Sequence, residues 1–123
     1  MNQPRLLALT TVLAATVLTS GCGKKKRYSP SCDRSVTLTA PWDGYQLPTS
    51  GGRVCSSDAS RAELQFLSGD RAGWERKFEE ALLAAGFAKD KCSSQSCTFK
   101  RDGERAVVQV VQTKRWVTVF VRK

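Results

Sequence analysis

The chain of 123 residues contains no histidine. This absence excludes the commonest general base, the Ser-His and Cys-His catalytic pairs, and every zinc site that depends on imidazole. No Ser-x-x-Lys spacing lies beside a motif that would form a pocket, and no pair of acidic residues is placed to act across a bond. We therefore expect no catalytic residue, no cofactor and no metal, and we expect that the protein is not an enzyme.

A long membrane-spanning apolar run is also lacking. Residues 6–18 are uncharged and rich in Leu, Ala, Val and Thr, but this stretch is shorter than a bilayer requires. Arg5 precedes it, and a positive residue before a short apolar run is typical of a secretory signal peptide. We therefore expect the protein to be exported.

The residues that follow the apolar run are Leu18-Thr19-Ser20-Gly21-Cys22. They resemble the lipobox of bacterial lipoproteins, with Thr19 where Leu is more usual. This resemblance, which covers residues 1–22, implies a signal peptide over residues 1–21, acyl chains such as palmitate on Cys22, and a lipid anchor in a membrane. Gly23 resembles the class sorted to the outer membrane, facing the periplasm or the cell surface. The alternative is an ordinary secretory signal, with Cys22 left as an odd thiol.

Lipidation of Cys22 would leave an even set of cysteines for pairing. An exported chain of this size favours disulfides over a four-cysteine zinc site. Four cysteines allow three connectivities. We expect the bonds Cys32–Cys55 and Cys92–Cys97.

Acidic side chains are few, with 11 Asp and Glu against 20 Lys and Arg. Part of the excess lies in residues 22–34, which we expect to form a basic tether. Its cations Lys24, Lys25, Lys26 and Arg27 could attract anionic lipid head groups, or could form only a solvated linker. We expect no nucleic-acid partner for a protein held at a membrane.

The remaining residues, 35–123, predict a single small α+β domain of order β-α-β-β-β, with one helix packed on a mostly antiparallel sheet. Apolar residues alternate over 62–66, after at most one short strand at 35–39. A helix should follow from the N-cap Asp70 to the stop at Gly86, burying one stripe of residues. The region from Gly23 to about Ser60 should form an irregular arm stapled by Cys32–Cys55. The buried stripe of the helix contains Trp74, Phe78, Ala81, Leu82 and Ala85.

Two hairpins are expected after residue 96. Asp102-Gly103 suits a type I′ turn and sets Phe99 opposite Ala106. A second turn centred on Thr113-Lys114 would set Val110 opposite Val117. Both registers place the same apolar residues under the helix: Phe99, Ala106, Val108, Val110, Val117, Val119 and Val121.

The opposite face of this sheet is the candidate binding face. It would be an apolar strip with a basic rim, suited to an envelope protein, a peptide or an anionic glycan. The alternative is that Trp42, Tyr45 and Leu47 of the arm fold across it and make it core. The strip contains Val107, Val111, Trp116 and Phe120, and the rim contains Lys100 and Arg122.

These patterns predict a lipid-anchored lipoprotein of the cell envelope that is not an enzyme and that binds or scaffolds an unknown ligand. A small disulfide-held inhibitor of a secreted hydrolase is one alternative. A purely structural envelope component is another.

Overall fold

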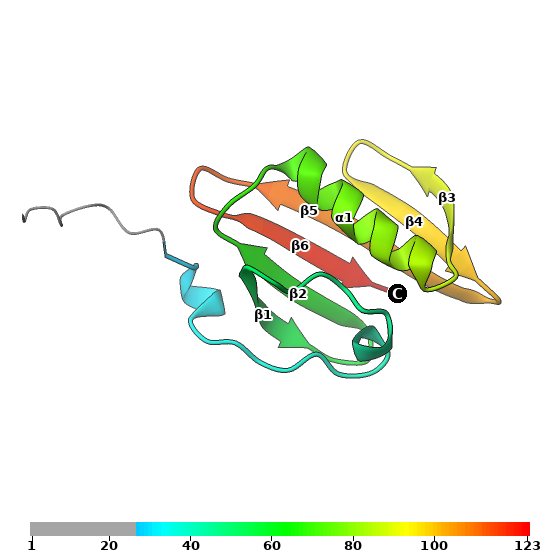
Figure 1. Ribbon diagram of the computed structural model, residues 1–123, viewed down its shortest axis with the longest axis horizontal. Helices are drawn as coiled ribbons and strands as arrows, with labels where there is room; N and C mark the ends of the chain where they lie inside the picture. Colours follow the sequence, from blue (N-terminus) through cyan, green and yellow to red (C-terminus); the bar gives the residue numbers. More distant parts are fainter. Residues whose placement is uncertain (1–26) are drawn as a thin grey trace, which may run out of the picture.

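The computed structural model describes residues 27–123, which form one helix on a six-stranded antiparallel sheet. The expected signal peptide, the lipobox with Cys22, and Lys24 to Lys26 lie outside the described residues. The strand order across the sheet is β1-β2-β6-β5-β4-β3 (Figure 1). This arrangement confirms the α+β class. The elements are β1 (Gly52–Ser57), β2 (Arg61–Phe66), α1 (Arg71–Ala84), β3 (Ala88–Cys92), β4 (Ser96–Arg101), β5 (Glu104–Gln112) and β6 (Val117–Arg122).

The helix begins and ends where the sequence predicts. The Asp70 side chain accepts a hydrogen bond from the backbone N–H of Gly73 at 2.8 Å, as an N-cap should. Gly86 has a φ of +98°, a left-handed conformation that favours glycine after a helix. Trp74 and Phe78 belong to the core, and the Trp74 ring stacks on Phe66 of β2 at 3.6 Å between centroids.

The first predicted hairpin register is confirmed, and the second is wrong by two residues. Phe99 pairs with Ala106, as expected. Val110 pairs with Val119 and not with Val117, because the turn is centred on Lys114 and Arg115. There the Thr113 hydroxyl oxygen accepts hydrogen bonds from the backbone N–H groups of Arg115 and Trp116, which fixes the turn one residue later. A shift of two residues changes every partner but keeps every side chain on its predicted face.

Two strands were not predicted. In β1 only Val54 is buried, and in β3 every residue is exposed, so neither strand has the alternation of apolar and polar residues that marks a half-buried strand. The order is therefore β-β-α-β-β-β-β. Residues 35–39 are not a strand, although the backbone N–H of Val36 donates to the carbonyl of Val54 at the β1 edge.

The aromatic residues of the arm pack on the same side of the sheet as α1. Trp42, Tyr45 and Leu47 are buried in one cluster with Phe66 and Phe78. Figure 1 shows α1 crossing the sheet over β5 and β4, whereas residues 42–47 of the arm, in the teal segment, lie at the ends of β1 and β2. The expectation that the arm might cover the opposite face is wrong, because α1 alone leaves the β1 side of its own face to be covered.

Both predicted disulfides, Cys32–Cys55 and Cys92–Cys97, are present. The first joins the short 3-10 turn Pro30–Cys32 to β1, and Cys32 is fully buried. Residues 27–34 of the expected tether therefore belong to the described structure. The second bond closes the turn between β3 and β4, where Cys92 and Cys97 are cross-strand partners.

Candidate functional site on the outer face of the sheet

We call the side of the sheet that faces away from α1 the outer face. Because successive side chains of a strand alternate between faces, each strand contributes every second residue to it. In β2 the residues under the helix are Ala62, Leu64 and Phe66, so the others point outward. The outer-face positions of the four central strands are Arg61, Glu63 and Gln65 in β2, Thr118, Phe120 and Arg122 in β6, Arg105, Val107, Gln109 and Val111 in β5, and Ser96, Thr98 and Lys100 in β4.

The first described residues of the chain are attached to this face. The side-chain oxygen of the buried Gln65 accepts a hydrogen bond from the backbone N–H of Ser29 at 2.6 Å. The Gln65 amide nitrogen donates to the hydroxyl of Ser29 at 3.0 Å and to that of Thr118 at 3.3 Å. The chain therefore joins the domain across the outer face.

Arg53 of β1 holds the same segment from its other side. Its Nη1 donates to the backbone carbonyls of Cys32 at 3.2 Å and Asp33 at 2.9 Å. The guanidinium also lies over the Tyr28 ring, 4.3 Å from the centroid. Together with the Cys32–Cys55 bond, these contacts fix residues 28–33 to the outer side of β1 and β2.

Charge is distributed unevenly between the two sides of the domain. The helix α1 is balanced, with three basic and three acidic residues in its sequence RAGWERKFEEALLA. The outer face is basic. On the described strands, the charged residues of this face are six cations, Arg53, Arg61, Lys91, Lys100, Arg105 and Arg122, and two acids, Glu63 and Asp90.

Two of these cations lie directly opposite each other in neighbouring strands, since Arg61 of β2 pairs with Arg122 of β6. Like charges in this position destabilise a sheet. Glu63 offsets part of the repulsion through an ion pair with Arg61 at 3.7 Å, at a partly exposed site where such a pair contributes little.

A shallow hollow of about 220 Å³ lies at this point. Its lining residues are Arg61, Gln109, Phe120 and Arg122. The Arg61 guanidinium lies over the Phe120 ring, 5.7 Å from the centroid. Guanidinium and amide groups donate hydrogen bonds, and the fork of an arginine matches the oxygens of a phosphate or carboxylate. The hollow therefore combines hydrogen-bond donors that suit an anion with one aromatic surface.

The turn before β2 positions Arg61. The Asp58 carboxylate accepts hydrogen bonds from the hydroxyl and the backbone N–H of Ser60, both at 2.8 Å, and from the backbone N–H of Arg61 at 3.0 Å. These bonds, the Ser60 hydroxyl first, hold the pKa of Asp58 below its usual range. A charged Asp58 thus fixes the backbone from which the Arg61 side chain extends.

The structure brings together most of the predicted binding-face residues, though in a different pairing. Val107 lies opposite Arg122 and not opposite Phe120, because of the two-residue shift in the β5–β6 register. Val107 is buried, Phe120 is half-buried, and Val111 is exposed.

Two predicted residues of the face, Trp116 and Lys100, do not line the hollow. Trp116 lies in the turn between β5 and β6, beyond the strand ends, and its backbone carbonyl accepts from the Thr113 N–H. The predicted pairing of Val111 with Trp116 is wrong, since Val111 lies opposite Thr118. Lys100 lies on β4 and makes an ion pair with Asp90 at 3.3 Å.

Arg61 was not identified from the sequence as a residue of this face. The alternation of residues 61–66 already indicates that Arg61 points away from the core. No sequence signal, however, predicts that β2 lies beside β6, since 50 residues separate Phe66 from its partner Val117 and the connection includes a helix and three other strands. Long-range pairing was the missing information.

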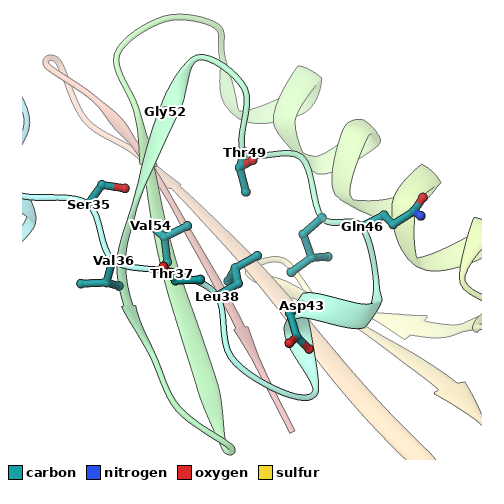
Figure 2. A pocket seen from close by; sticks show the side chains of 10 residues that line it. Ser35, Val36, Thr37, Leu38, Asp43, Gln46, Thr49, Gly52 and Val54 are labelled. Atoms are coloured by element: carbon teal, nitrogen blue, oxygen red, sulfur yellow. The ribbon is translucent and has the colours of Figure 1, made fainter.

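A second hollow, of about 460 Å³, lies between the arm and the edge strand β1 (Figure 2). Leu38 and Val54 point toward its centre, and Gln46 points away from it. Asp43 is the only charged residue among those that line it. This hollow is the seam where the arm covers β1, and it contains no pair of groups suited to acid–base chemistry.

A third hollow, of about 450 Å³, lies between α1 and the β3–β4 hairpin. Its charged groups are of both signs, and Glu79 makes an ion pair with Lys89 at 2.9 Å. The Cys92–Cys97 bond forms part of its wall. Because its acids and bases occur together, this hollow has no preference for a ligand of one charge.

Among residues 27–123, no group of His, Cys, Asp and Glu side chains is placed to hold a metal ion. In the same part of the chain, no helix has the length and apolar character needed to cross a membrane. No protein family, no curated protein and no solved structure matches this chain.

Proposed function

We propose that this protein is a lipoprotein of the bacterial cell envelope, anchored by acyl chains on Cys22, that acts as a binding or scaffolding module and not as an enzyme. The observation that supports the anchor best is the sequence Leu18-Thr19-Ser20-Gly21-Cys22 directly after a short apolar run. Gly23 favours the outer membrane over the inner one. The folded domain would then face the periplasm or the cell surface.

The disulfides support export. Two bonds in a domain of this size are typical of an oxidising compartment and are rare in the cytosol. They also use all the cysteines of the described residues, so that Cys22 is the one cysteine without a partner of this kind. A cysteine committed to lipid explains the odd total.

The outer face supports a binding role. It combines a basic surface, opposed arginines and partly exposed apolar side chains. Opposed arginines destabilise a sheet, and exposed apolar side chains mark interaction sites, so the combination favours a bound partner. A non-enzymatic role is favoured by the absence of histidine from the chain, by the single charged residue in the hollow beside β1, and by the mixed charges of the hollow beside α1.

One feature favours inhibition of a secreted hydrolase as a second candidate function. Ser93, Ser94 and Gln95 are exposed in a loop whose two ends are joined by the Cys92–Cys97 bond. A rigid exposed loop of this kind suits insertion into an active site, because little conformational entropy is lost on binding. Substitution of Gln95 would then weaken capture of the hydrolase, whereas substitution of Phe120 would not.

Metabolic labelling with a palmitate analogue tests the anchor. We expect wild-type protein to carry the label and to sediment with membranes, and we expect Cys22→Ser to lose both properties. The double variant Cys92→Ser/Cys97→Ser is the control, because it removes two other sulfur atoms and should keep the label. Unchanged labelling and membrane retention in Cys22→Ser would refute the proposal.

A further inference from the structure

We propose that the outer face of the sheet docks on the anionic head groups of the bilayer that holds the anchor. This inference rests on the proposed lipidation of Cys22, and it adds an orientation: the basic side of the domain faces the lipid and the α1 side faces away. The ligand chemistry is the phosphate of an anionic lipid such as phosphatidylglycerol.

The point at which the chain joins the domain favours this orientation. Ser29 is buried against Gln65 on the outer face, and Tyr28 lies under Arg53 on the same side. Six peptide units connect Cys22 to Tyr28, which can span at most about 20 Å. A lipid on Cys22 would therefore keep the outer face near the bilayer surface.

Charge complementarity selects the outer face over the α1 side. At physiological ionic strength, electrostatic attraction is screened within about 8 Å, so only the face in close approach contributes. The outer face presents an excess of cations, whereas the basic and acidic residues of α1 balance. Arg27 and the neighbouring Lys24, Lys25 and Lys26 add positive charge to the segment that connects this face to Cys22.

The hollow between β2, β5 and β6 gives the surface a place for a phosphate. Arg61 and Arg122 oppose each other across the strands, and Gln109 of β5 lines the same hollow. A phosphate at this position would accept hydrogen bonds from both guanidinium groups and would relieve their repulsion. Phe120 and Val111 would contact the apolar boundary beneath the head groups.

Photocrosslinking in reconstituted vesicles tests the inference. Mature, lipidated protein purified from membranes would carry a photoreactive phenylalanine in place of Val111 on the outer face, or in place of Leu83 on α1. These residues have nearly equal exposed fractions, 39% and 44%, so Leu83 is a matched control. The vesicles would contain phosphatidylcholine alone, or phosphatidylcholine mixed with phosphatidylglycerol.

We expect the Val111 position to crosslink to lipid several-fold more than the Leu83 position, and only in vesicles with phosphatidylglycerol. Arg105→Gln/Arg122→Gln should lower that crosslinking several-fold. Arg76→Gln/Lys77→Gln makes the same change of charge on α1 and should leave it unchanged. Circular dichroism and intact disulfides would confirm that each variant is folded.

Equal crosslinking at the two positions, or no dependence on phosphatidylglycerol, would overturn the docking. A crosslink from Val111 to an envelope protein in whole cells, with none to lipid, would also overturn it and assign the face to a protein partner. Flotation with phosphatidylcholine vesicles reports the anchor separately. Failure of the protein to float with these vesicles would refute lipidation and therefore the docking as well. Flotation without crosslinking from Val111 would refute the docking alone.

Discussion

At the scale of single residues, Gln65 connects the start of the described chain to the sheet. Its side chain is almost fully buried, and its amide makes three hydrogen bonds, two to Ser29 and one to Thr118. A buried amide needs such partners, because an unmade hydrogen bond in the interior costs more than the same bond contributes. Gln65 is therefore structural, although it lies on the face that we assign to lipid.

Substitution of Gln65 measures this role. Gln65→Ala leaves the backbone N–H of Ser29 without its acceptor, so we expect the free energy of unfolding to fall by about 1–3 kcal/mol. Gln109→Ala, at a half-exposed position on the same face, should change it by no more than about 0.5 kcal/mol. Chemical denaturation of both variants provides the comparison, and equal losses would contradict the role given to Gln65.

At the scale of elements, local signals in the sequence predicted most of the fold. The Asp70 cap, the Trp74 and Phe78 stripe and the Asp102-Gly103 turn each depend on residues within a few positions of one another, and each was confirmed. The turn of the second hairpin was predicted one residue too early. Hydrogen bonds to the Thr113 hydroxyl fix its position, and no glycine marks it in the sequence.

Elements without a buried side were not predictable in this way. β3 buries none of its residues, so no apolar pattern distinguishes it from a loop, and only its pairing with β4 defines it. The side of the sheet on which the arm lies was also undetermined. Apolar residues such as Trp42 and Leu47 indicate burial, but they carry no information about which surface they cover.

Truncation of Trp42 tests the position of the arm. The indole is fully buried, and its Nε1 donates to the backbone carbonyl of Asp58 at 2.7 Å. Trp42→Ala should therefore lower the free energy of unfolding by about 3–5 kcal/mol. Trp116→Ala, at a half-buried position in the β5–β6 turn, should cost clearly less. Thermal and chemical denaturation distinguish the two, and a larger cost for Trp116 would show that the arm is not the main cover of the core.

At the scale of the whole molecule, the domain has two different sides. One side is closed by α1 and the arm over a common core, and its charges are balanced along the helix. The other side carries the basic surface and receives the N-terminal segment, which is joined to it by Cys32–Cys55. Phe120 and Arg122 could be named from the sequence, but Arg61 and the hollow could not, because the hollow depends on the pairing of β2 with β6.

We propose that this asymmetry orients the domain when Cys22 carries lipid. With Cys22 acylated, the attachment point and the basic surface lie on the same side of the domain, and both act toward the bilayer. Without the acyl chains, the same surface would have to find an anionic ligand in solution, with no fixed orientation.

The mass of intact protein extracted from the membrane fraction tests the anchor most directly. We expect a chain that begins at Cys22, lacks residues 1–21, and exceeds its peptide mass by that of the attached acyl chains. We also expect the mass to reflect two disulfides, with no free thiol. A soluble chain cleaved at another position, with an unmodified thiol on Cys22, would contradict the account.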